Sequence, residues 1–117
     1  MEAIPGPSSI VMALQLSGFS GQMFTFHGYF PREEKELTYK LRNLPKKVAH
    51  LFIETPYRTE KLFKMTLSAL QPRDLLCVAL ELMGPTQFVE THSIQEWKNR
   101  SIPPGKHRAV FVIFIAG

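Results

Sequence analysis

The amino-acid sequence predicts an α/β fold: a mixed, mostly five-stranded sheet flanked by helices. Helical and strand patterns alternate along the chain. Two apolar runs, "DLLCVALEL" and "AVFVIFI", have strand length and lack polar alternation, as expected for strands covered on both faces. Because 117 residues suffice for one core and not for two, we predict a single domain over residues 1–117. Strands separated by a helix should be parallel, and the pair joined across "MGP" antiparallel.

The chain opens on the stiff turn "IPGPSS", followed by a helical pattern. Pro7 suits a first helical turn because its missing N–H would be unsatisfied there, and Ser8 or Ser9 can cap the amides. An apolar helical face runs over residues 10–18 and ends at a glycine. Gly6 also permits a close backbone approach to a ligand, so the turn either starts a helix or forms part of a binding site.

A strand and a helix are predicted next. In "QMFTFHGYF", Phe24 and Phe26 alternate with polar side chains, which is the period of a strand that Gly28 and Pro31 should end. "PREEKELTYKLRNL" has glutamates in its first turn and leucines at helical spacing, and Pro45 follows it. This pattern predicts an amphipathic helix with a solvated outer face.

The second half alternates in the same way. "VAHLFIE" predicts a strand, after which Thr55 should cap a helix opened by Pro56. The two-sided apolar strand "DLLCVALEL" is followed by the strand "TQFVETHSI" and a short helix in "QEWKNR". The loop "PPGKHR" then leads into the terminal strand "AVFVIFI".

Composition limits the class of protein. Apolar residues make up 44% of the chain and charged residues 21%, as in globular proteins. The net charge of +4 permits a polyanionic partner, although acids are scattered among the bases. The single Cys77 lies in an apolar run, which favours a buried thiol over a nucleophile and fits a cytoplasmic location. No membrane span or signal peptide is expected, and we assign no metal to the four isolated histidines.

Two carboxylates stand at the ends of predicted strands. Glu54 ends "VAHLFIE", where α/β sheets gather ligand-binding groups. It can accept from a ribose or an amine, or it can pair with Arg58 one turn further on. Glu81 ends the next buried strand and either takes part in a site or lies where the strand has reached solvent. No residue of the chain is identified as a catalytic base.

Several motifs follow one another along the chain in an informative order: "IPGPSSIVMALQLSGF", "FHGYFPREEKE", "HLFIETPYR", "VALEL", "SIQEW" and "AVFVIFIAG". Together they resemble the carboxyl-terminal domain of the tetrapyrrole (corrin/porphyrin) methylase superfamily over nearly the whole chain. Within it they look most like the ribosomal RNA small subunit methyltransferase I branch, which 2′-O-methylates a cytidine of ribosomal RNA. The segment "MGPTQFVET" departs from that branch and is more like a less characterised group of related methylases.

The resemblance implies a methyl donor, S-adenosylmethionine, bound between two domains of a cytoplasmic enzyme that is commonly a homodimer. It assigns cofactor binding to the opening turn, to two strand ends and to the last strand; these residues are Pro5, Gly6, Pro7, Ser8, Ser9, Ile53, Glu54, Ala79, Leu80 and Phe114. The strand ends would contact the adenosine through backbone groups, and Phe114 would form a wall for the adenine.

The family's N-terminal domain, with its glycine-rich cofactor loop, has no counterpart in this chain. By the family's plan the chain is the C-terminal half of a two-domain methyltransferase, and we expect it to be inactive by itself. The expected methyl acceptor is ribosomal RNA or, as an alternative, a tetrapyrrole or other small molecule. A different class of function stays open, a non-catalytic module for dimerisation or RNA binding.

Overall fold

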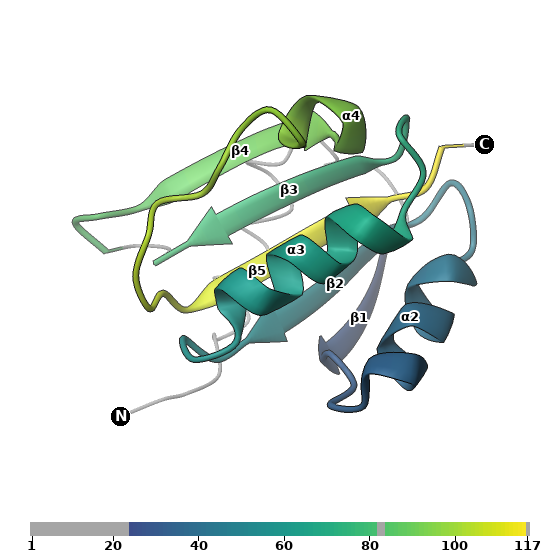
Figure 1. Ribbon diagram of the computed structural model, residues 1–117, viewed down its shortest axis with the longest axis horizontal. Helices are drawn as coiled ribbons and strands as arrows, with labels where there is room; N and C mark the ends of the chain where they lie inside the picture. The colour runs from purple at the N-terminus through teal and green to yellow at the C-terminus, as the bar shows by residue number, and fades with distance from the viewer. Residues whose placement is uncertain (1–23, 82–83, 117) are drawn as a thin grey trace.

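The structure, a computed structural model, describes residues 24–81 and 84–116 (Figure 1). In chain order its elements are β1 (Phe24–Tyr29), α2 (Glu34–Arg42), β2 (Ala49–Glu54), α3 (Thr59–Ala69), β3 (Leu75–Leu80), β4 (Phe88–Ser93), α4 (Ile94–Trp97) and β5 (Ala109–Phe114). The predicted opening turn and the helix after it, residues 5–18, lie outside the described residues. Within the described part of the chain, no helix is long and apolar enough to cross a membrane.

The strands form one mixed sheet in the order β1-β2-β5-β3-β4. β1 and β2 are parallel, β5 is antiparallel to both of its neighbours, and β4 is antiparallel to β3. This arrangement confirms the predicted mixed five-stranded α/β fold and the antiparallel pair across "MGP". Because β2 and β3 both run antiparallel to β5, they end on the same side of the sheet, where β5 begins. We call this side the carboxyl end of the sheet.

The described helices all pack on one face of the sheet. Figure 1 shows α3 in front of β2 and β5, α2 at the side near β1, and α4 next to β4. Their buried side chains share a hydrophobic cluster with strand residues; it includes Leu37, Leu41, Leu62, Phe63, Trp97, Phe52, Val78 and Phe111. A second cluster covers the opposite face and contains Ala49, Leu51, Ile53, Cys77, Ala79, Val110 and Val112. No described helix contributes to the second cluster.

β1 is a strand as predicted, but its burial does not alternate and it does not end at Gly28. The register with β2 shifts between Phe26 and Gly28, and the strand continues to Tyr29. Gly28 has a φ of 79°, a backbone conformation that glycine adopts without steric cost. The glycine therefore forms a β-bulge instead of a strand end, and the strand ends at Tyr29, before Pro31 as predicted.

α3 begins later than predicted, and Thr55 is not its cap. Arg58 occupies the N-cap position, where its side chain does not cap the helix, and the Thr55 hydroxyl lies 3.5 Å from Glu54 Oε2. The Arg58 N–H donates to the Thr55 carbonyl at 3.1 Å, which closes a turn over residues 55–58. Pro56 thus lies in this turn and not in the first helical turn. The turn places Tyr57 and Arg58 at the carboxyl end of the sheet.

The boundary between β4 and α4 also differs slightly from the prediction. The strand ends at Ser93, and the helix begins at Ile94. The Ser93 hydroxyl accepts from the Glu96 N–H while the Glu96 carboxylate accepts from the Ser93 N–H, which is a capping box. These reciprocal bonds satisfy two amides at the start of α4, and the bond from the Ser93 backbone lowers the pKa of Glu96.

Candidate functional site

Strand register brings four of the predicted cofactor-binding residues together. They are Ile53, Glu54, Ala79 and Leu80. Glu54 and Leu80 both pair with Ala109 on β5, and Ile53 and Ala79 both pair with Val110, one residue further along. The four residues therefore occupy two neighbouring rows across three strands at the carboxyl end of the sheet.

The four side chains divide between the two faces of the sheet. Ile53 and Ala79 belong to the cluster that lacks a described helix, and Leu80 belongs to the cluster under the helices. Glu54 is only 4% exposed and faces the start of α3. The last residue pair between β1 and β2 joins Tyr29 to Ile53, and Glu54 is the next residue along β2. The pairing of β1 with β2 therefore does not extend to Glu54.

The Glu54 carboxylate has one satisfied oxygen and one unsatisfied oxygen. Oε2 accepts from the Thr55 N–H at 3.0 Å. Oε1 lies 3.5 Å from Arg58 Nη1, and among the described residues it is the buried side-chain oxygen that has no hydrogen-bond partner. Because a buried polar atom without a hydrogen bond is costly, Oε1 is a natural acceptor for a ligand donor.

Arg58 lies beside the Glu54 carboxylate and helps to hold it in place. Its guanidinium lies one turn along the chain from Glu54, and Nη2 donates to the Pro31 carbonyl at 3.3 Å. The pairing considered from the sequence is therefore present. It does not exclude a ligand contact, because Oε1 can accept further hydrogen bonds.

Glu81 holds two loops together. It lies beyond the end of β3 with a φ of 50°, and its N–H donates to the Arg108 carbonyl at 3.0 Å. Its Oε2 accepts from the Arg108 N–H at 3.1 Å and lies 3.6 Å from His107 Nδ1. Through these contacts the Glu81 carboxylate holds the backbone in place at the start of β5.

Of the other predicted cofactor-binding residues, the structure describes only Phe114, which lies away from this place. Phe114 pairs with Ala49 and Leu75 at the opposite end of the sheet. It is five residues from Ala109 along β5, which corresponds to about 17 Å in an extended strand. Pro5, Gly6, Pro7, Ser8 and Ser9 lie outside the described residues. The described candidate site therefore rests on the ends of β2 and β3.

The loop before β5 reaches the same end of the sheet and was not among the predicted site residues. The Thr59 hydroxyl lies 2.6 Å from the His107 carbonyl, and the Gly105 N–H donates to Glu60 Oε2 at 3.2 Å. These bonds hold residues 103–108 against the start of α3. The sequence feature that could have indicated these residues is a pair of loops next to strands, "PYR" and "GKHR", which carry basic and aromatic side chains. Their proximity depends on strand order.

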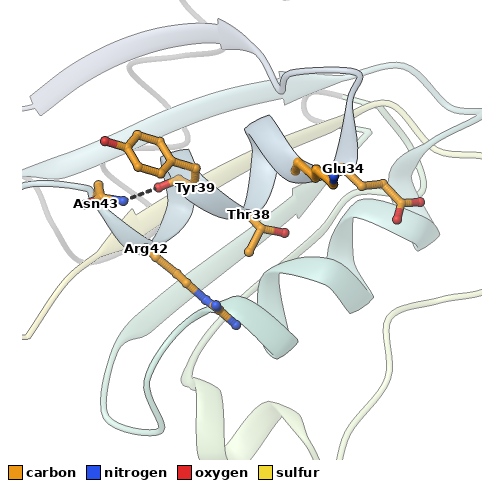
Figure 2. Close-up of a pocket in the computed structure, with 6 residues that line it drawn as sticks. Glu34, Thr38, Tyr39, Arg42 and Asn43 are labelled. Carbon is orange, nitrogen blue, oxygen red and sulfur yellow. Dashed lines mark hydrogen bonds between the residues drawn. The ribbon is translucent and has the colours of Figure 1, made fainter.

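A groove on the outer side of α2 lies apart from these residues. Figure 2 shows five of its side chains, which come from α2 and the residue after it: Glu34, Thr38, Tyr39, Arg42 and Asn43. The Asn43 side-chain amide donates to the Tyr39 carbonyl at 2.7 Å and closes the last turn of the helix. None of the predicted cofactor-binding residues that the structure describes lines this groove.

Among the described residues, Cys77 and the histidines form neither a metal site nor an activated nucleophile. Burial raises the pKa of the Cys77 thiol to about 11, which disfavours a thiolate and confirms the predicted buried thiol. Within residues 24–81 and 84–116, no group of three or more His, Cys, Asp or Glu side chains is placed to hold a metal ion. Two histidines do meet: His27 Nε2 lies 2.9 Å from His50 Nδ1, and His50 Nε2 lies 2.8 Å from the Pro45 carbonyl.

The histidine pair predicts a pH dependence of stability. Burial, the Lys40 ammonium and His50 lower the pKa of His27 from 6.5 to about 4. The unfolded chain binds this proton below pH 6.5, whereas the folded chain does not until about pH 4, so the stabilisation present above pH 6.5 is lost between these values. As the pH is lowered through this window, the unfolding free energy of the wild-type protein should fall. We expect this fall to exceed that of the His27→Gln variant by on the order of 1 kcal/mol. Urea unfolding at a series of pH values measures both, and parallel profiles would contradict the assignment.

Comparison with known proteins places this geometry in a known fold. No protein-family model matches the chain, and no curated protein matches it. The solved methyltransferase CobJ is 17% identical with a TM-score of 0.59, over 96% of this chain and 49% of that one. A uroporphyrin-III C-methyltransferase from Thermus thermophilus is 18% identical with a TM-score of 0.53, over 97% and 50% of the two chains. A structure of that type of enzyme from the same organism, complexed with S-adenyl homocysteine, is 15% identical with a TM-score of 0.51, over 95% and 51%.

The chain thus spans about half the length of each of these methyltransferases. At such low identity the likeness establishes a shared fold. It agrees with the fold predicted from the motifs.

Proposed function

We propose that the chain is the cofactor- and substrate-binding half of an S-adenosylmethionine-dependent methyltransferase. The observation that carries the proposal is the register at the carboxyl end of the sheet. Two strand ends implied as cofactor contacts lie in common rows across β5, and one of them ends in a buried carboxylate oxygen without a hydrogen bond. The fold shared with solved methyltransferases supports the same reading.

The residues at this end of the sheet fit such a cofactor. Glu54 Oε1 can accept from a ribose hydroxyl or from an ammonium group, and the Arg58 guanidinium lies 3.5 Å from the same oxygen. Ile53 and Ala79 lie in the neighbouring row of the sheet, with their side chains on the face opposite to the helices. S-adenosylmethionine supplies an electrophilic methyl group on a sulfonium. The contribution of this chain is to bind and orient the donor in a dry site.

The methyl acceptor that we propose is a ribose hydroxyl of ribosomal RNA, with a tetrapyrrole as the second candidate. The basic chain, with a net charge of +4, supports a polyanion. The uroporphyrin methyltransferases of similar fold support the second candidate. We also propose that the enzyme is a cytoplasmic homodimer in which an N-terminal domain of the same protein completes the cofactor site.

Calorimetry tests the cofactor assignment. The full-length protein is expected to bind S-adenosylmethionine and S-adenosylhomocysteine at one saturable site. Adenosine triphosphate serves as a control, since it shares the nucleoside but lacks the amino-acid portion. Absence of binding by the full-length protein at millimolar concentrations of both ligands would refute the proposed function and favour a non-catalytic module.

A further inference from the structure

We propose that Tyr57, Lys106 and Arg108 form a docking platform for single-stranded RNA at the carboxyl end of the sheet, next to Glu54. The inference rests on the proposed function, because it places the acceptor beside the methyl donor. It adds an RNA-binding role for three residues that the sequence patterns did not single out.

The aromatic part of the platform is Tyr57. Its side chain belongs to the turn after β2 and is 79% exposed, so one face of the ring can receive a planar group. Lys106 Nζ lies 4.7 Å from the centre of the same ring. An exposed aromatic ring next to a cation can stack a base and contact the adjoining phosphate.

The charge at the platform is unpaired. Lys106 and Arg108 are both exposed, and among the described residues neither side chain lies within ion-pair distance of a carboxylate. The nearby acids are already engaged, since Glu54 faces Arg58 and Glu81 holds the Arg108 N–H. The ammonium of Lys106 and the guanidinium of Arg108 are therefore available to phosphate groups.

The platform is also pre-organised. The loop that carries Lys106 is tied to α3 through the Thr59 hydroxyl and the Glu60 carboxylate, and its end is tied to Glu81. A rigid loop loses little conformational entropy when a ligand binds. Tyr57 is three residues from Glu54, so a nucleotide on the ring would adjoin the candidate cofactor site.

The openness of the platform favours RNA over a tetrapyrrole. A compact ligand is normally held in a concave site that buries most of its surface. A largely exposed ring with two free cations instead suits a strand that continues beyond the platform and is bound through phosphates and stacking. Uroporphyrin III, which is planar and carries carboxylates, is the discriminating competitor.

The test measures binding of a fluorescein-labelled, single-stranded RNA oligonucleotide of mixed sequence to the full-length protein. Tyr57→Ala is expected to raise the Kd about tenfold, equivalent to about 1.4 kcal/mol, whereas Tyr57→Phe keeps the ring and most of the affinity. Lys106→Ala should reduce the slope of log K against log salt by about 0.7, the release expected for one phosphate contact on a single strand. Tyr39→Ala and Lys46→Ala, both at exposed positions on other parts of the surface, are the matched controls.

The outcomes separate this inference from the proposed function. Calorimetric binding of S-adenosylhomocysteine with equal RNA affinity in Tyr57→Ala and Tyr39→Ala would overturn the platform and leave the methyltransferase assignment intact. Displacement of the RNA by uroporphyrin III, or binding of uroporphyrin III without RNA binding, would also overturn it in favour of a small-molecule acceptor. Loss of cofactor binding by the wild-type protein is the separate result that refutes the proposed function.

Discussion

Replacing Trp97 with alanine is expected to lower the free energy of unfolding by about 3–5 kcal/mol, the usual loss for a large buried aromatic side chain. Trp97 is fully buried, and its Nε1–H donates to the Leu76 carbonyl at 2.8 Å. Its ring meets the rings of Phe63 and His92 edge to face, with centroids 5.2 and 4.8 Å away. Alanine would remove both ring contacts and the hydrogen bond that joins α4 to β3.

Urea unfolding followed by far-ultraviolet circular dichroism measures this loss. Trp97→Phe keeps most of the ring and removes the hydrogen bond, so we expect a smaller loss of about 1–2 kcal/mol. Tyr39→Ala is the exposed control and should change the unfolding free energy by about 0.5 kcal/mol or less. A loss below about 1 kcal/mol for Trp97→Ala would show that α4 is not an integral part of the core.

Local periodicity was sufficient to predict most elements of the fold. The strand "AVFVIFI" is apolar at every position because both faces of β5 are covered, and the leucines of α2 repeat at helical spacing because one side faces the sheet. Such patterns reflect burial, which the folded structure then confirms. Strand order is different, since the insertion of β5 between β2 and β3 depends on pairing between distant segments.

Two errors of detail had local signals that were available. A glycine inside a strand pattern can mark a bulge as well as an end, and Gly28 proves to be the former. The spacing of Ser93 and Glu96 is that of a capping box, which marks where β4 gives way to α4. The position of Thr55 was misleading because its amide serves the neighbouring Glu54 carboxylate and not the helix.

The candidate site was predictable only in part. Glu54 was identified because it stands at the carboxyl end of an apolar strand, where α/β sheets gather ligand-binding groups, and its burial and unsatisfied oxygen make it a stronger candidate. Tyr57 and Lys106 are separated by 49 positions in the numbering of the chain, so their contact required the fold. Exposed loop residues also carry no hydrophobic pattern, and sequence periodicity therefore says nothing about them.

Glu54→Gln is expected to weaken both the fold and cofactor binding, for different reasons. The amide keeps the shape of the side chain but leaves the Arg58 guanidinium, which is 19% exposed, without its anionic partner. Breaking such a buried pair from one side costs about 3 kcal/mol of unfolding free energy. If Oε1 also accepts from the cofactor, the Kd for S-adenosylhomocysteine should rise by about tenfold, or about 1.4 kcal/mol.

A double-mutant cycle with Arg58→Gln separates these effects. Removing both charges should recover part of the stability lost in Glu54→Gln, because no unpaired guanidinium remains. Cofactor affinity should not recover in the double variant, since the carboxylate that binds the ligand is still missing. A purely structural role of Glu54 predicts a different result. The cofactor affinity of the folded protein would then be unchanged in Glu54→Gln and in the double variant, while the unfolding free energy would still depend on whether one or both charges are removed. Unfolding curves and calorimetry on the four full-length proteins therefore decide whether the buried carboxylate serves the ligand or only the turn that follows β2.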